Sequence, residues 1–176
     1  TYIATANAVL YQHATPVLAD IDPRTFNMDP EEVARRITPA TKVIMPIDYG
    51  GNPANHDALQ EIADAHGVTL LVDGAQSLGG MYHGRNLCSF GLMTTISLHA
   101  AKVITSVEGG LVLTNDGDLA ERARIVRNQG EAKLPRSQGE YPQLHVDLGA
   151  RVEGVGLFGA GHVPGLRGAT VGIDVG

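Results

Sequence analysis

The chain has 176 residues, of which 43% are hydrophobic and 18% charged, which suits a folded domain with a buried core and excludes a disordered acidic chain. The formal net charge is −6 and no basic run is longer than Arg35-Arg36, which argues against binding to nucleic acid or to an anionic membrane. Cys88 is the single cysteine and cannot form an intramolecular disulfide bond, so we expect a reducing, cytoplasmic setting.

The first element indicated along the chain is a helix. Asp29 is a typical N-cap, Pro30 suits the first helical position, and Glu31 and Glu32 complement the positive end of the helix dipole. This pattern predicts a helix that runs to Arg36.

Two short apolar runs, 43–47 and 68–72, have the composition of strands that are buried on both faces of a parallel sheet. With a helix between them they form a βαβ unit, whose right-handed crossover leaves functional loops at the carboxyl ends of the strands. Asp48 and Asp73 directly follow the two runs. We therefore expect both acids at that edge of the sheet.

The helix of this unit is indicated by apolar residues that recur at helical spacing from Leu59 onward. Either Asn55 or Asp57 can cap its first turn, and Gly67 ends it just before the second strand. Further along, residues 111–114 predict another strand.

Residues 116–127 predict an amphipathic helix. Its inward residues are expected to be Leu119, Ala123, Ile125 and Val126. Beyond residue 130 the helical and strand periodicity is lost. Residues 131–148 are polar and turn-rich and are expected to form a surface loop or connection. The glycine-rich tail 149–176 has no regular periodicity, so we assign it no fold.

Candidate chemistry concentrates in residues 73–76 (Asp-Gly-Ala-Gln) and 97–102 (Ser-Leu-His-Ala-Ala-Lys). Asp73 ends an apolar strand, where an ionised carboxylate is costly unless a cation or a hydrogen-bond donor meets it. Lys102 has apolar neighbours, and partial desolvation favours the unprotonated amine that forms a Schiff base with an aldehyde. Taken alone, such an acid is as often a cap, and such a lysine is more often a surface residue.

Several landmarks together resemble one family. They are residues 1–8, 22–23, 27–30, 37–39, 49–53, 72–76, 97–102 and 108–110. In their order and spacing the chain resembles the sugar aminotransferases of the DegT/DnrJ/EryC1/StrS family, which are pyridoxal-phosphate enzymes of fold type I. The resemblance spans about residues 1–130. It implies an α/β fold with three αβα layers around a mostly parallel sheet, and it makes 1–130 an incomplete part of the cofactor-binding large domain.

The resemblance implies roles for five residues. Lys102 matches the lysine that binds pyridoxal 5′-phosphate as a Schiff base and then moves a proton between the carbons of substrate and cofactor. Asp73 would keep the pyridine nitrogen protonated, and Gln76 would lie near the phenolic oxygen. Ser97 matches a serine that donates a hydrogen bond to the phosphate. Tyr2 matches an aromatic residue that stacks on the pyridine ring, although an aromatic residue at a strand end more often packs in the core.

Other reactive side chains have no such place. His99 and Cys88 lack any pattern of a catalytic triad or metal site, so no metal is expected, and residues 108–110 are simply a turn into the next strand. Leu92 and Leu98, and Cys88 as well, stand where the family commonly has an acid, an aromatic residue and a glycine. These departures alter packing and leave the named chemistry in place.

The implied reaction transfers an amino group, with L-glutamate as the expected donor, to a keto-sugar carried by a nucleoside diphosphate, in the biosynthesis of amino sugars and surface polysaccharides. The implied partners are the nucleotide sugar, the amino donor and, in the full-length form, a second copy of the chain. Family members are considerably longer, so the chain is expected to be a fragment, a frameshifted product or a short natural protein.

Three alternatives remain. One is a non-catalytic truncated remnant of such an enzyme. The second is a sugar 3-dehydratase of the same fold, a branch in which histidine replaces the lysine matched by Lys102. The third is a plain nucleotide-binding α/β module, which requires a G-x-G-x-x-G turn after a strand that this sequence lacks.

Overall fold

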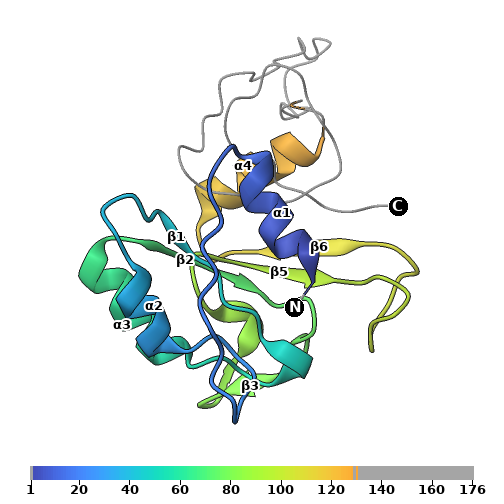
Figure 1. Cartoon of the computed structure of the whole chain (residues 1–176). Helices are drawn as coiled ribbons and strands as arrows, with labels where there is room; N and C mark the ends of the chain where they lie inside the picture. Colours follow the sequence, from blue (N-terminus) through green and yellow to red (C-terminus); the bar gives the residue numbers. More distant parts are fainter. Residues whose placement is uncertain (1, 129, 131–176) are drawn as a thin grey trace.

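The computed structural model describes residues 2–128 and 130. A central sheet separates two layers of helices (Figure 1). The sheet comprises, in spatial order, β1 (Val43–Ile44), β2 (Thr69–Asp73), β5 (Met93–Ser97) and β6 (Gly110–Leu113). The helices are α1 (Ile3–Tyr11), α2 (Pro30–Arg36), α3 (His56–His66) and α4 (Gly117–Arg127), with short 3-10 helices η1 (Tyr49–Gly51) and η2 (Leu87–Ser89). A separate hairpin pairs β3 (Met81–Tyr82) with β4 (Arg85–Asn86).

The sheet is mostly parallel. β1 runs parallel to β2 and β2 to β5, whereas β6 is antiparallel to β5. The strand expected over 43–47 is shorter than its apolar run, because Pro46 has no N–H group to continue the ladder. Pairing resumes beyond the proline as an isolated bridge between Ile47 and Asp73. The expected α/β architecture of three layers is confirmed.

The helix boundaries follow from capping residues. The Asp29 side chain accepts a hydrogen bond from the first turn of α2, and Asp116 does the same for α4. Asn55, rather than Asp57, caps α3. Gly67 ends α3 in the left-handed conformation at φ 62°, which glycine adopts without steric cost.

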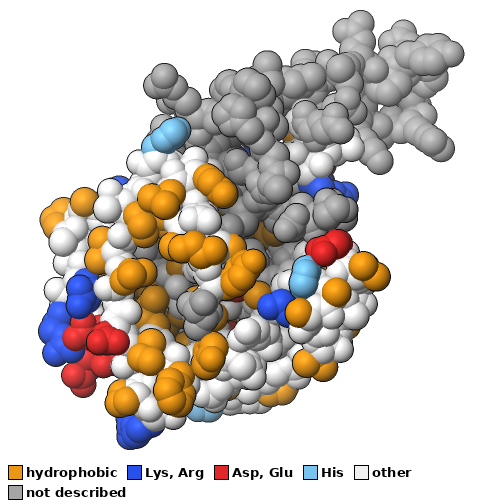
Figure 2. Space-filling view, turned by 45° about the vertical axis from the view of Figure 1, so that its right-hand side comes forward, with side chains coloured by type: hydrophobic (Ala, Val, Ile, Leu, Met, Phe, Trp, Pro, Cys, Tyr) orange, Lys and Arg blue, Asp and Glu red, His pale blue; other side chains and the backbone are white. Residues whose placement is uncertain are grey.

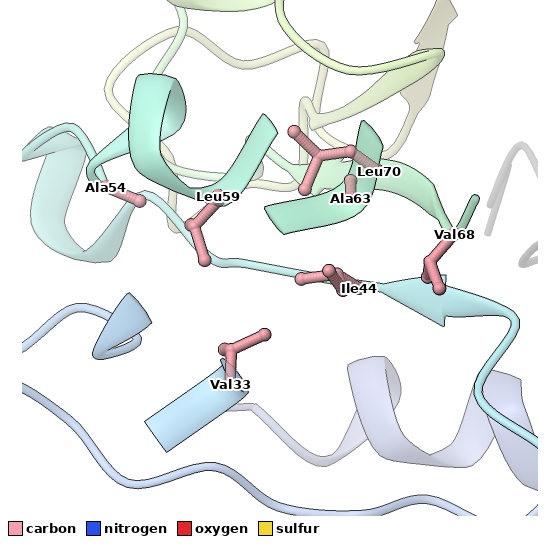
Figure 3. Close-up of a cluster of buried hydrophobic side chains, with 7 residues drawn as sticks. All are labelled: Val33, Ile44, Ala54, Leu59, Ala63, Val68 and Leu70. Carbon is pink, nitrogen blue, oxygen red and sulfur yellow. The ribbon is translucent and has the colours of Figure 1, made fainter. Parts of the chain in front are cut away.

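One face of the sheet packs against α2 and α3. The buried side chains of this core are Val33, Ile44, Ala54, Leu59, Ala63, Val68 and Leu70 (Figure 3). On the opposite face, Leu71 and Met93 pack against α4 through Leu119, Ala123 and Val126, as its amphipathic pattern predicts. The prediction that Ile125 also points inward is not confirmed, because Ile125 does not belong to this cluster of described residues.

Leu59 tests the packing of α3 on the sheet, because its side chain is completely buried. Leu59→Ala is expected to lower the free energy of unfolding by about 2–5 kcal/mol, through lost apolar burial and the cavity left behind. Urea denaturation of the complete gene product measures this. The matched control is Glu61→Ala at an exposed position of α3, expected to change the same quantity by less than about 0.5 kcal/mol. Equal effects of the two variants would show that the α3 packing is wrong.

The beginning of the chain differs from its expected form. Tyr2 does not lie at a strand end. It is the N-cap residue of α1, and 76% of it is exposed. α1 has no side-chain cap and no acid in its first turn, so the usual signals for a helix start are missing.

The surface loop expected over 131–148 and the tail 149–176 lie outside the described residues. Within the described part of the chain, no helix has both the length and the apolar character that crossing a membrane requires.

Candidate functional site

The carboxyl edge of β2 and β5 brings together two of the residues singled out in the sequence. Asp73 is the last residue of β2 and pairs in register with Thr95, and Ser97 follows two residues later at the end of β5. Paired residues on parallel strands, and residues two apart on one strand, face the same side of a sheet. Asp73 and Ser97 therefore share one sheet face, the one that α1 and α4 cover (Figure 1).

Both carboxylate oxygens of Asp73 are held. Thr5 of α1 donates its hydroxyl hydrogen to Oδ2 at 2.6 Å, and the Ala75 N–H donates to Oδ1 at 3.1 Å. The backbone is equally fixed, because the Asp73 N–H donates to the Pro46 carbonyl and the Asp48 N–H donates to the Asp73 carbonyl. Asp73 is only half-buried, so part of its side chain remains accessible.

Thr5 is a site residue that local sequence did not single out. It lies in the matched run 1–8, but nothing near it indicates a contact with an acid 68 residues away. Only the fold, which lays α1 over this edge of the sheet, brings the two side chains together.

Gln76 lies in the loop after β2 and reaches the turn that follows β1. Its Oε1 accepts the Gly50 N–H at 2.6 Å. A backbone amide can only donate, so this bond sets the orientation of the side-chain amide and leaves Nε2 as a donor. The approach is close, since a Cβ at Gly51, where φ is +80°, would lie 3.0 Å from the Gln76 carbonyl oxygen.

The same turn is held from its other side by a buried asparagine. The Tyr49 N–H donates to Asn27 Oδ1 at 2.9 Å, and Asn27 Nδ2 donates to the Asn52 carbonyl at 3.0 Å. A fully satisfied buried amide is a rigid support. The turn that contacts Gln76 is therefore held in place independently of any ligand.

Residues 97–102 form a tight turn after β5. Ser97 Oγ accepts the His99 N–H at 3.3 Å, which leaves the serine hydroxyl hydrogen for another acceptor. The Lys102 N–H donates to the His99 carbonyl at 2.9 Å, and the Ala101 N–H donates to His99 Nδ1. His99 thus organises the turn, and its Nε2 lies 3.5 Å from Glu108 Oε1.

Lys102 is half-buried in this turn, on the chain that leaves the sheet from the same edge. Among the described residues, no hydrogen bond or ion pair joins its side chain to Asp73, Gln76 or Ser97. Tyr2 lies at the start of α1, one turn before Thr5. The structure thus brings Asp73 and Ser97 to one edge of the sheet, where Gln76 contacts the neighbouring turn. Lys102 follows β5 at this edge, and Tyr2 begins α1.

Other candidate chemistry is weaker in the described part of the chain. No group of three or more side chains there could hold a metal ion, and Cys88 is a free, half-buried thiol. An open hollow is lined by Gly91, Leu92 and residues 115–118. It lies at the opposite edge of the sheet, where β5 begins and β6 ends.

Known proteins resemble this chain in both sequence and structure. A family model described as the DegT/DnrJ/EryC1/StrS aminotransferase family matches residues 1–153. A GDP-perosamine synthase of Caulobacter vibrioides is 45% identical over 130 residues, which cover 74% of this chain and 35% of that protein.

Among solved structures, DesI, determined in the presence of its TDP-sugar product, is 42% identical. It has a TM-score of 0.70 over 73% of this chain and 33% of its own. PseC of Helicobacter pylori, described as an aminotransferase of pseudoaminic acid biosynthesis, is 33% identical, with a TM-score of 0.74 over 82% of this chain and 38% of its own.

The chain spans about a third of the length of the relatives it matches. Within that third, the three layers and the mostly parallel sheet agree with those relatives, which makes it an incomplete fold type I large domain. The family match over most of its residues establishes that the chain belongs to the DegT/DnrJ/EryC1/StrS aminotransferase family.

Proposed function

We propose that the chain is part of a pyridoxal-phosphate-dependent aminotransferase that transfers an amino group from L-glutamate to a keto-sugar carried by a nucleoside diphosphate. Family membership and the nucleotide sugars named for its relatives support this reaction. The structural observation that carries the proposal is Asp73, held through both oxygens at the carboxyl edge of β2 on the same sheet face as Ser97. The product would enter the biosynthesis of amino sugars and surface polysaccharides.

The donors and acceptors at this edge fit pyridoxal 5′-phosphate. Asp73 offers a fixed, half-buried carboxylate to a protonated ring nitrogen, and Gln76 Nε2 offers a donor to a phenolic oxygen. Ser97 offers its hydroxyl hydrogen to a phosphate oxygen. When bound, the cofactor supplies an electron sink for the negative charge that develops on the carbon bearing the amino group.

Each of the other site residues has a separate role in this proposal. Lys102 supplies the amine that holds the cofactor and, once released, carries a proton to and from carbon. Asp73 keeps its negative charge beside the ring nitrogen, with Thr5 holding one of its oxygens. Tyr2 is exposed at the start of α1 and is available to stack on the ring. Residues 1–130 would form part of the large domain that carries this site.

The proposal includes a homodimer and a cytoplasmic setting. Figure 2 shows apolar side chains gathered on the face on which α1 lies. Exposed apolar residues of α1 and the segment after it are Tyr2, Ile3, Leu10, Tyr11, Val17, Leu18, Ile21 and Phe26. A contiguous exposed apolar surface is typical of a protein interface, which supports assembly with a second copy. The single cysteine supports the reducing compartment.

The test is a transfer assay with the complete gene product and added pyridoxal phosphate. ¹⁵N-labelled glutamate is offered with GDP-, UDP- and TDP-linked 3-keto and 4-keto sugars, and mass spectrometry follows the label. We expect ¹⁵N in one of the sugars and stoichiometric 2-oxoglutarate. Loss of a sugar hydroxyl without nitrogen incorporation would contradict the proposal and indicate a dehydratase, and no change in any sugar would favour a non-catalytic remnant.

A further inference from the structure

A buried Asp–His pair lies directly behind the candidate site. Asp48 follows β1 and His56 begins α3, and neither side chain has any exposed surface. His56 Nε2 lies 2.8 Å from Asp48 Oδ1, and the same oxygen accepts the Ala54 N–H at 2.9 Å. An ionised carboxylate can only accept hydrogen bonds, so Nε2 of His56 carries the hydrogen. The chemistry proposed above uses neither side chain.

Aromatic rings hold the imidazole in one orientation. Phe90 stacks on His56 with ring centres 4.6 Å apart, and Tyr82 meets it edge-on at 5.6 Å. Burial raises the pKa of the Tyr82 phenol, which therefore stays protonated and donates to Asn55, the cap of α3. His56 consequently cannot turn away from Asp48 without disrupting this packing.

The pair is incompletely satisfied. In the described part of the chain, Asp48 Oδ2 and His56 Nδ1 are buried without a hydrogen-bond partner. Such a pair stabilises a fold less than apolar side chains of the same shape would, because the desolvation of the unpartnered atoms is not offset.

The backbone of Asp48 connects the pair to the site. Its N–H donates to the Asp73 carbonyl at 3.2 Å, and its carbonyl accepts the Gly51 N–H at 3.1 Å. Between them in the turn, the Gly50 N–H donates to Gln76 Oε1. A displacement of Asp48 would thus be passed to Asp73 through one bond and to Gln76 through the turn.

We propose that His56 and Asp48 are positioning residues for the cofactor site, setting the place of the 49–51 turn and thereby the alignment of Gln76 and Asp73. This inference rests on the proposed function, because it concerns the same site. His56 holds the Asp48 carboxylate, which in turn holds the Ala54 N–H three residues beyond the turn. Both side chains are completely buried, so neither would touch a bound cofactor, and their effect would be on geometry.

The test measures pyridoxal-phosphate binding by the complete gene product, without any substrate. His56→Leu removes the donor to Asp48. It is expected to raise the Kd for pyridoxal phosphate about 10-fold, which is the effect on affinity of losing about one well-aligned hydrogen bond. It is also expected to shift the absorption maximum of the bound cofactor. His56→Gln places an amide N–H near the former Nε2 and is expected to restore both. Leu59→Ala, in the same helix but remote from the turn, is the control for lost stability.

The outcomes separate this inference from the proposed function. Failure of the unsubstituted protein to bind pyridoxal phosphate would overturn both. Normal binding by the unsubstituted protein together with an unchanged Kd and spectrum in His56→Leu would overturn only the positioning role. So would equal losses of affinity in His56→Leu and Leu59→Ala, because the effect would then follow stability. If His56→Leu does not fold, the double variant Asp48→Asn/His56→Leu leaves no buried charge unpaired, and the same loss of affinity is expected there.

Discussion

Lys102→Ala is expected to reduce amino-group transfer by at least about 10³-fold, because under the proposed function one substitution removes both the amine that holds the cofactor and the base that moves the proton. His99, three residues earlier, cannot replace it, since Nδ1 accepts the Ala101 N–H and Nε2 faces Glu108. The rate is measured in single turnovers with glutamate. Borohydride treatment followed by peptide mass spectrometry identifies the amine that carries the cofactor.

The chain offers a matched control for Lys102. Lys42 is an exposed lysine just before β1, at the amino end of the strand and therefore away from the carboxyl edge that carries the candidate site. Lys42→Ala is expected to leave both the rate and the borohydride label unchanged. Lys102→Arg keeps the positive charge but supplies no usable nucleophile, so it should be as inactive as the alanine variant. A label on any peptide other than that of Lys102 would contradict the assignment.

Helices α2, α3 and α4 and strands β1 and β2 could be predicted because their signals are local. Asp29, Asn55, Gly67 and Asp116 each mark a helix end through a side-chain or backbone preference that acts within one turn. The strand that ends at Asp73 and its neighbour β1 are indicated by continuous apolar runs, as expected for strands buried on both faces.

α1 and β5 could not be predicted in the same way. α1 has neither a cap nor charged residues at its ends, and β5 (Met93–Ser97) mixes hydroxyl and apolar side chains. Their structure depends on partners distant in sequence, such as the pairing of β5 with both β2 and β6. Local propensity is a weak guide where tertiary packing decides.

The candidate site likewise contains residues that the sequence indicates locally and residues that depend on distant contacts. Asp73 stands out in the sequence because it follows an apolar strand, and residues 97–102 stand out through the pattern they share with the family. Thr5, Gly50 and the pair Asp48–His56 support these residues. Their contacts could not be predicted, although Asp48 itself is expected at this edge, because each contact joins segments that only the fold brings together. The sequence thus indicates the groups proposed to do the chemistry more readily than the groups that hold them in place.

Asp73→Asn is expected to slow the chemistry far more than it weakens cofactor binding. The structure accommodates the amide, since its oxygen can keep the Ala75 N–H bond while its NH₂ group donates to Thr5, whose hydroxyl can also accept. The fold and the hydrogen bonds of this side chain are therefore expected to be retained, and what is lost is the negative charge proposed to face the ring nitrogen. Removing one preorganised electrostatic contact of this kind costs about 10²–10³-fold in kcat.

Cofactor affinity should change much less, by under about 10-fold, because Lys102, Ser97 and Gln76 remain to bind other parts of the cofactor, as proposed above. The glutamate half-reaction, measured at matched cofactor occupancy, separates the two effects. Thr5→Val is the companion variant: it removes the hydroxyl donor to Oδ2 but leaves the charge, so its rate should lie between those of the unsubstituted protein and Asp73→Asn. Equal rates for Asp73→Asn and the unsubstituted protein would mean that the Asp73 carboxylate does not face the ring nitrogen, and that the site must be sought elsewhere on this edge of the sheet.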